Sequence, residues 1–237
     1  MEKHPASAVI YQGKSLIDKQ DIVVIISGLD GNSQNRKTGH MAQVDIILTD
    51  PKPTDAVKSG SDFGICGNCT LRPIYKNAAS CYVNKGWSPL TKWKCFQAGK
   101  YPRMTPTQAN TILKDNGISV RIGAYGEPSA VPFKVWQQLV DGTKFTAYTH
   151  SFNEHWYDKR LDSICMLSLD TKLNTVNASS KRQFRTYKII GSKNELKPNE
   201  IMCPADMSKA DGIQCKTCLL CCGSSQLKAK NIAIIKI

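Results

Sequence analysis

Four cysteines near the carboxyl end of the chain have the residue type and spacing of a metal site. Cys203, Cys215, Cys218 and Cys221 follow the pattern C-x11-C-x2-C-x2-C. Gaps of two residues let successive thiolates reach one ion or cluster from a tight loop, and four thiolates complete a closed coordination shell. The spacing therefore predicts either a structural zinc ion or an iron–sulfur cluster.

A second group of cysteines lies far upstream, in the segment ICGNCTLRPIYKNAASCYV. Cys66, Cys69 and Cys81 follow the pattern C-x2-C-x11-C, and no fourth ligand is equally obvious. Three thiolates leave one coordination position open, which is what a catalytic metal or a site-differentiated cluster requires. If the protein is an enzyme, we expect its chemistry at this triad.

Disulfides and buried free thiols are the alternatives to metal binding for the ten cysteines. Disulfide scaffolds are mostly short secreted domains, whereas this chain has 237 residues, starts with the charged segment MEKHPAS and has no run resembling a signal peptide. Cys165, within the apolar run ICMLSL, is most simply a small core residue. Cys95 and Cys222 also fall outside both patterns, and either could replace a predicted ligand.

The chain is strongly basic, because 32 Lys and Arg residues stand against 19 Asp and Glu residues, a formal net charge of +13. Aromatic residues that could stack on bases lie among the basic ones at Trp87, Trp93, Phe96 and Tyr101. Core packing of these rings and a solubilising role of lysine are the alternatives. We expect nucleic acid as the partner.

No apolar run approaches the roughly 20 residues that cross a bilayer, so we expect a cytoplasmic protein without a membrane partner.

Strands alternate with helices over most of the chain. Apolar runs at 21–28 and 41–49 predict two early strands, and a capping Thr105 followed by Pro106 predicts the start of a helix. From residue 119 onward, SVRIGAY, KFTAYTHSF, SICMLSL, QFRTYKII and NIAIIKI predict further strands. Six to eight strands in this rhythm predict an α/β protein, built as a full or partial parallel β/α barrel with cysteine-rich metal-binding loops. A doubly wound sheet is the alternative.

We expect one domain over residues 1–237. It would comprise N-terminal strands at 1–50, a cysteine-rich basic insertion at 60–102, and β/α repeats with the downstream cysteines at 105–237.

Barrel enzymes place their catalytic residues at the carboxyl ends of strands. Glu127, His150 and Asp170 follow or end three predicted strands, and Cys203 ends a fourth, so we expect them to share one rim as catalytic or ligand residues. Each also has a structural explanation, since Glu127 or Asp170 can cap a helix and His150 can be a hydrogen-bonded core histidine.

The order of these features resembles that of radical S-adenosylmethionine enzymes with an auxiliary cluster. The shared features are a cysteine triad after an early strand, the segment Gly126-Glu127-Pro128 after the next, and a cysteine-rich carboxyl-terminal segment. The resemblance implies that the triad holds a 4Fe-4S cluster, whose unique iron binds the methionyl amine and carboxylate, and that Gly126 and Glu127 lie beside that cofactor. The usual triad spacing is C-x3-C-x2-C, and Tyr125 replaces the first glycine of the usual GGEP.

The chain is also similar to an uncharacterised family carried by tailed bacteriophages, in the segments NRKTGHMAQ, ICGNC, SCYV, GAYGEPSAVP and AYTHSF. That similarity implies a role in nucleic-acid metabolism, such as DNA modification, in the cytoplasm of a host cell.

Two other functions fit the same residues. In one, the chain resembles the tRNA-guanine transglycosylases and their DNA-acting relatives, with Asp170 as the nucleophile of base exchange and structural zinc on the four downstream cysteines. In the other, both cysteine groups are structural zinc sites in a non-enzymatic module that binds nucleic acid.

Overall fold

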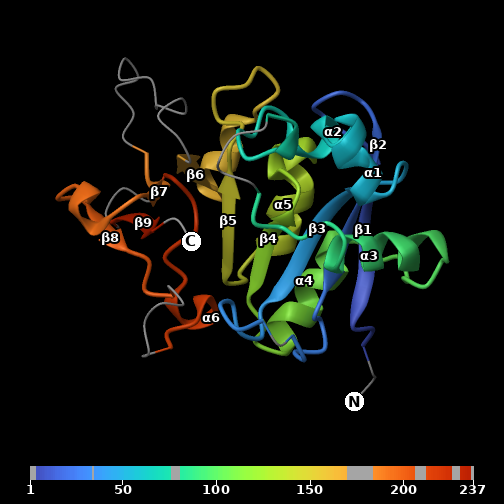
Figure 1. Ribbon diagram of the computed structural model, residues 1–237. Coiled ribbons are helices and arrows are strands. Elements are labelled where there is room, and N and C mark those ends of the chain that lie inside the picture. The colour runs from blue at the N-terminus through green and yellow to red at the C-terminus, as the bar shows by residue number, and fades with distance from the viewer. Residues whose placement is uncertain are drawn as a thin grey trace.

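A computed structural model describes residues 4–33, 35–75, 81–169, 184–205, 212–225 and 230–235. These residues form one sheet of nine strands in the spatial order β1-β2-β3-β4-β5-β6-β7-β9-β8 (Figure 1). The strands are β1 (Ser7–Lys14), β2 (Asp21–Ser27), β3 (Ala42–Leu48), β4 (Val120–Tyr125), β5 (Phe145–Thr149), β6 (Met166–Leu169), β7 (Thr186–Ile190), β8 (Glu200–Met202) and β9 (Asn231–Ile235). Spatial neighbours follow sequence order except for β8 and β9.

Two kinds of pairing divide the sheet. β1, β2 and β3 pair antiparallel, whereas all pairings from β3 to β8 are parallel. The expected α/β fold is confirmed. The sheet is open, however, and its first strands break the expected parallel pattern. The connection at 15–20 is too short for a crossover helix, so it can join only antiparallel neighbours.

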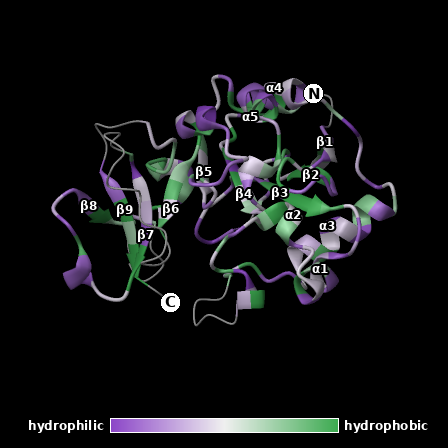
Figure 2. Cartoon of the chain, turned by 90° about the horizontal axis from the view of Figure 1, so that it is seen from above, coloured by the Kyte–Doolittle hydropathy of each residue, from purple (hydrophilic) through white to green (hydrophobic). Residues whose placement is uncertain are grey.

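The helices cover both faces of the sheet. Seen from above, α4 and α5 lie on one side of β3 and β4, and α1, α2 and α3 lie on the other (Figure 2). The α-helices of the described residues are α1 (Pro53–Ser59), α2 (Phe63–Cys66), α3 (Ser88–Gln97), α4 (Pro106–Asp115), α5 (Phe133–Val140) and α6 (Cys215–Cys218). Short 3-10 turns lie at Pro73–Tyr75, Pro128–Ala130, Lys159–Ser163 and Lys193–Glu195.

Helix α4 begins where the sequence predicts. The Thr105 hydroxyl accepts a hydrogen bond from the Gln108 N–H at 3.2 Å, and Gln108 Oε1 accepts one from the Thr105 N–H at 2.8 Å. This reciprocal capping box satisfies two N–H groups that the first helical turn leaves free. Ala109 and Leu113 are fully buried, so the apolar face packs on the sheet as expected.

The buried apolar side chains form two clusters. The larger cluster is built on β1 to β5 together with α4 and α5. The smaller cluster includes residues of β6 and β9 and two of the downstream cysteines. Its members are Met166, Cys203, Ala205, Cys221, Ile232 and Ile234. Among the described residues, no helix is both long enough and apolar enough to cross a membrane.

Candidate metal centres

The three upstream cysteines lie in one loop beyond the end of β3. Cys66 is the last residue of α2, and its carbonyl oxygen accepts a hydrogen bond from the Cys69 N–H at 3.2 Å. The Cys81 N–H donates to the Leu71 carbonyl oxygen at 2.8 Å, which returns the chain to this loop. Burial raises the pKa of the Cys66 thiol, and negative charge on Asp62, Cys69 and Cys81 raises it further. The structure therefore places the three predicted cysteines in one part of the fold, although their side chains are not arranged to hold one metal ion.

A buried ion pair fixes the triad loop. The Arg72 guanidinium donates to Asp62 Oδ1 at 2.6 Å and to Oδ2 at 3.2 Å. It also donates to the carbonyl oxygens of Gly60 and Gly67, at 2.8 and 3.1 Å. Both charged side chains are at most 5% exposed. A bidentate pair of this kind fixes geometry as well as charge, so the loop around Cys66 is held to the ends of α1 and α2.

Glu127 reaches the triad loop from the end of β4. Its N–H donates to the carbonyl oxygen of Ile65, the residue before Cys66, at 2.6 Å, and its side chain is buried. Carboxylate oxygen Oε2 accepts a hydrogen bond from the His150 N–H at 2.9 Å and lies 3.5 Å from His150 Nδ1. The two predicted rim residues therefore contact each other beyond the carboxyl ends of β4 and β5.

Four buried polar atoms on this rim have no hydrogen-bond partner among the described residues. They are Glu127 Oε1, Tyr125 Oη, Ser129 Oγ and Trp156 Nε1. The Trp156 ring packs edge-on against Phe63 of α2, with ring centroids 5.9 Å apart, so it borders the triad loop. Buried polar atoms are paired as a rule, and exceptions point to a ligand or ordered water. The rim therefore fits a polar ligand beside the triad.

The other residues predicted beside the cofactor or on this rim are not all explained as Glu127 is. Gly126 has a φ of +85°, and a Cβ atom there would lie 2.7 Å from Ile46 Cβ. Close packing against β3 therefore explains this glycine without a ligand contact. Cys203 lies in the second apolar cluster with Cys221, whereas Cys66 packs against the first. Asp170 lies outside the described residues.

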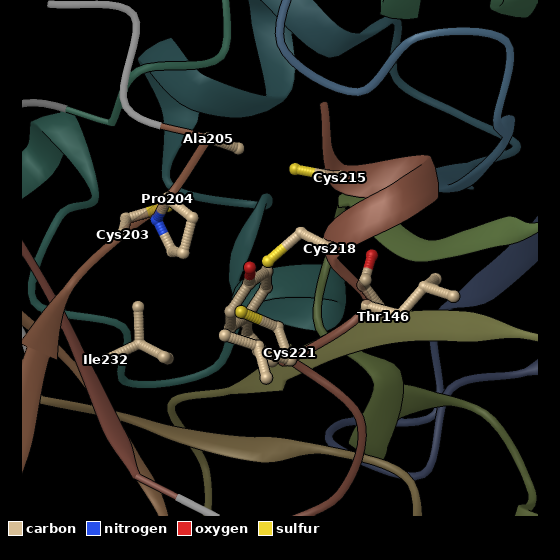
Figure 3. A pocket seen from close by; sticks show the side chains of 11 residues that line it. Thr146, Cys203, Pro204, Ala205, Cys215, Cys218, Cys221 and Ile232 are labelled. Carbon is tan, nitrogen blue, oxygen red and sulfur yellow. The ribbon is translucent and has the colours of Figure 1, made fainter. Parts of the chain in front are cut away.

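All four downstream cysteines line one small pocket (Figure 3). Cys203 follows β8, and Cys215 and Cys218 begin and end α6. The Cys221 carbonyl oxygen accepts a hydrogen bond from the Ala147 N–H of β5 at 3.0 Å. In Figure 3 the sulfur atoms of Cys215, Cys218 and Cys221 point toward the same hollow. The predicted four-cysteine group is thus assembled from three separate parts of the fold.

Burial dominates the electrostatics of this pocket. It raises the pKa of Cys221 to about 12, although a hydrogen bond with Tyr148 acts in the opposite direction. It also raises the pKa of Cys215, and the neighbouring Cys203 thiol raises it further. Thiolates in such a place need a nearby cation, because burial and mutual repulsion both favour the neutral thiol.

The donor types suit a metal in both places, but the side chains are not in ligand geometry. Within the described ranges, no three or more Cys, His, Asp or Glu side chains are arranged to hold one metal ion. All ten cysteines are free thiols. Thiolates select zinc, copper(I) and iron–sulfur clusters, so the donor sets fit such groups once rotation about χ1 brings the sulfur atoms of each group closer together.

The remaining cysteines do not extend either group. Cys165 is fully buried in the main core, as predicted. Cys222 follows a pocket cysteine but does not line the pocket. Cys95 lies beside Tyr101, whose pKa is raised to about 12 by burial and then by Cys95.

Sequence reasoning missed two arginines beside the downstream pocket. Arg121 lies in β4 and Arg185 immediately precedes β7. Arg121 pairs in register with Thr146, which lines the pocket, so both side chains leave the sheet on the same face. Arg121 lies among mostly apolar residues in the segment SVRIGAY, and Arg185 lies between Phe184 and Tyr187 in the segment QFRTYKII. A charged residue in such surroundings is the signal that could have found them.

The aromatic residues proposed for base stacking divide into two sets. Trp93, Phe96 and Tyr101 pack against the main core, and Trp93 Nε1 donates to the Thr49 carbonyl oxygen at 3.1 Å. Trp87 is different, because it is 76% exposed. Tyr82, next to Cys81, is 69% exposed. Trp87 is therefore the most exposed ring of the predicted set, and Tyr82 is similarly exposed although its hydroxyl accepts a hydrogen bond from Arg121.

Comparison with known proteins gives no match to any protein-family model, curated protein or solved structure. The residues of the two cysteine groups and their surroundings are therefore the basis for assigning a function.

Proposed function

We propose that the chain is an iron–sulfur enzyme of the radical S-adenosylmethionine type that acts on a nucleic acid or a nucleotide, for example in DNA modification. Cys66, Cys69 and Cys81 would hold a 4Fe-4S cluster, and Glu127 would receive the amine of the cofactor. The cluster, when bound, supplies an electron for reductive cleavage of S-adenosylmethionine. The observation that carries the proposal is the contact between the triad loop and the buried Glu127, whose Oε1 has no described partner.

The order of the parallel strands supports this assignment. β3 to β7 lie side by side in sequence order, as strands do in part of a β/α barrel. The triad follows the first of these strands, Glu127 follows the second and His150 follows the third. Parallel sheets bind ligands beyond the carboxyl ends of their strands. We therefore propose a partial barrel with its reactive rim at Glu127.

The residues of the rim have separate tasks in this proposal. The His150 N–H holds Glu127 Oε2, which leaves Oε1 to accept hydrogen bonds from an ammonium group. A charge-assisted bond of this kind is about twice as strong as a neutral one. Phe63 and Trp156 pack beside the triad loop and help to exclude water from it. Arg72 keeps the loop in place through Asp62.

Charge and exposure support a nucleic-acid substrate. The net charge of +13 favours a phosphate backbone. Tyr82 and Trp87 are the most exposed large apolar side chains of the described residues, and Tyr82 adjoins a triad cysteine. Exposed aromatic rings on a basic surface suit stacking with bases of a single strand.

The test is cleavage of S-adenosylmethionine by the anaerobically prepared, chemically reduced protein. The wild type should release methionine, and Cys66→Ala should abolish the release because it removes a cluster ligand. Cys95→Ala is the matched control, since Cys95 lies outside the triad, and it should retain the wild-type rate.

A wild-type protein with its cluster in place that releases no methionine would contradict the proposal. If the protein then contains only zinc, an Asp170→Asn variant separates the alternatives. Loss of base exchange would favour a transglycosylase, and unchanged nucleic-acid binding without any exchange would favour a binding module.

A further inference from the structure

We propose that the pocket of Cys203, Cys215, Cys218 and Cys221 is a separate structural centre that binds a single zinc ion, and that Arg185 and Arg121 compensate its negative charge. The proposal does not depend on the function proposed for the upstream triad. It rests on the residues around the pocket.

Arg185 is a buried cation without an anionic partner among the described residues. It is 2% exposed. Within the described ranges, its guanidinium donates only to backbone carbonyl oxygens, which belong to Leu220 at 2.6 Å, Gly223 at 3.4 Å and Lys230 at 3.1 and 3.3 Å. Burying a charge is costly unless a charge of opposite sign lies nearby. Leu220 and Gly223 flank the pair Cys221 and Cys222, so the cation lies next to the pocket.

Arg121 approaches the pocket from the sheet. Its one hydrogen bond among the described residues is to the Tyr82 hydroxyl, at 2.7 Å, and it has no carboxylate partner there. The side chain leaves β4 on the same face as the pocket residue Thr146. Arg121 therefore lies on the pocket side of the sheet.

The charges balance when one divalent ion occupies the pocket. Four thiolates carry −4, a zinc ion carries +2, and the two arginines supply the remaining +2. Without such a centre, two guanidinium groups face four neutral thiols. The cavity is also small, with a volume of about 10 Å³. That size is compatible with a single ion.

Such a centre would link the segments that carry the four downstream cysteines to one another and to β5. The ligands come from the segment after β8, from α6 and from the loop beside β5. Gly223 in this loop approaches Ser163 so closely that a Cβ would lie 2.6 Å from its carbonyl oxygen. Closed four-thiolate zinc sites typically stabilise a fold in this way and leave no open coordination position.

The experiment measures zinc retention by the full-length protein in competition with a chelator. Cys218→Ser should lose the ion, whereas Cys222→Ser is the matched control and should keep it. The wild type with cobalt(II) as a probe should show the visible sulfur-to-metal absorption of a tetrahedral four-thiolate site.

The role of the arginines is tested by comparing zinc affinity in variants that remove the positive charge with the affinity in variants that keep it. Arg185→Gln removes the charge but keeps donors, and it should weaken zinc binding roughly 10- to 100-fold, as outer-sphere changes do. Arg185→Lys keeps the charge and should lose less. Arg121→Met should also weaken zinc binding. This variant tests charge compensation even if the Arg185 variants fail to fold. Arg160→Met is the control, since Arg160 is exposed and paired with Asp158.

Several results would overturn the inference. They are a wild type that retains no zinc, a cobalt spectrum without thiolate absorption, and equal zinc affinity in Arg121→Met and Arg160→Met. Iron with sulfide bound to the downstream cysteines in a protein lacking the triad would also overturn it, because the centre would then be a cluster.

Discussion

Glu127 combines burial, a fixed orientation and an unpartnered oxygen at the edge of the triad loop. Its Oε2 is occupied by the His150 N–H, and its N–H is bonded to Ile65. These contacts leave Oε1 without a hydrogen-bond partner among the described residues. A carboxylate held in this way is suited to binding a cation rather than to proton transfer in open solvent.

The first prediction concerns that oxygen. Glu127→Gln should weaken S-adenosylmethionine binding roughly 10- to 100-fold, because a hydrogen bond to a charged group contributes about 1.5–3 kcal/mol. Cluster content should be unchanged, since Glu127 is not an iron ligand in this account. Equilibrium binding and iron analysis on the same anaerobic sample measure both quantities.

Glu154→Gln is the matched control for this variant. Glu154 accepts a hydrogen bond from Asn68, which lies between Cys66 and Cys69, at 3.0 Å, and a glutamine oxygen can also accept this bond. Equal cofactor affinity in the two variants would show that Glu127 does not contact the amine.

At the scale of elements, the loop between α1 and the triad depends on the buried pair of Arg72 and Asp62. Arg72→Met should lower the free energy of unfolding by roughly 3–5 kcal/mol, because it leaves the Asp62 carboxylate buried without its partner. The double variant Arg72→Met, Asp62→Asn should recover much of this loss. Denaturant unfolding of the single and double variants measures the difference.

The pair of Arg72 and Asp62 should also affect iron binding at the triad. The single variant should also lose iron, since the bonds from Arg72 to Gly60 and Gly67 position the residues that flank Cys66. Wild-type stability in Arg72→Met would show that the pair does not hold the loop.

Local sequence signals predicted much of the sheet and of the cysteine groups. Thr105 and Pro106 marked a helix start that the structure confirms, because capping is decided by neighbouring residues. The strands β4, β5, β6, β7 and β9 also follow predicted apolar runs. Strand β1 was missed, since SAVIYQGK has only a short apolar part and gains its burial from pairing with β2.

Contacts between distant residues could not be predicted in the same way. The buried pair of Lys92 and Asp45 joins α3 to β3, and the carbonyl contacts of Arg185 join the start of β7 to the downstream cysteine loop. Neither pair leaves a periodic pattern in the sequence, because each depends on how the elements pack. The sequence predicted that Glu127 and the cysteines share one rim, but it did not predict that Glu127 contacts the triad loop directly.

At the scale of the whole molecule, the positive charge and the exposed rings of Tyr82 and Trp87 predict binding of single-stranded nucleic acid. Affinity for a short single strand should fall roughly 20-fold between ~50 and ~200 mM salt if about three phosphates are contacted. Trp87→Ala should weaken binding by roughly 5- to 100-fold, since stacking contributes about 1–3 kcal/mol per base. Fluorescence anisotropy with a labelled oligonucleotide measures both.

Ile213→Ala is the control for the loss of an exposed apolar side chain, because Ile213 is 50% exposed and lies beside α6. It should bind the oligonucleotide as the wild type does. Affinity that is insensitive to salt and to Trp87→Ala would remove nucleic acid as the partner of this surface.

The most direct test of the central claim is a count of iron, acid-labile sulfide and zinc in one anaerobically purified sample of the full-length protein. We predict about four iron and about four sulfide per chain, lost in a variant lacking Cys66, Cys69 and Cys81, together with about one zinc that this variant retains. Zinc alone, without iron or sulfide, would contradict the account of the triad as a redox centre.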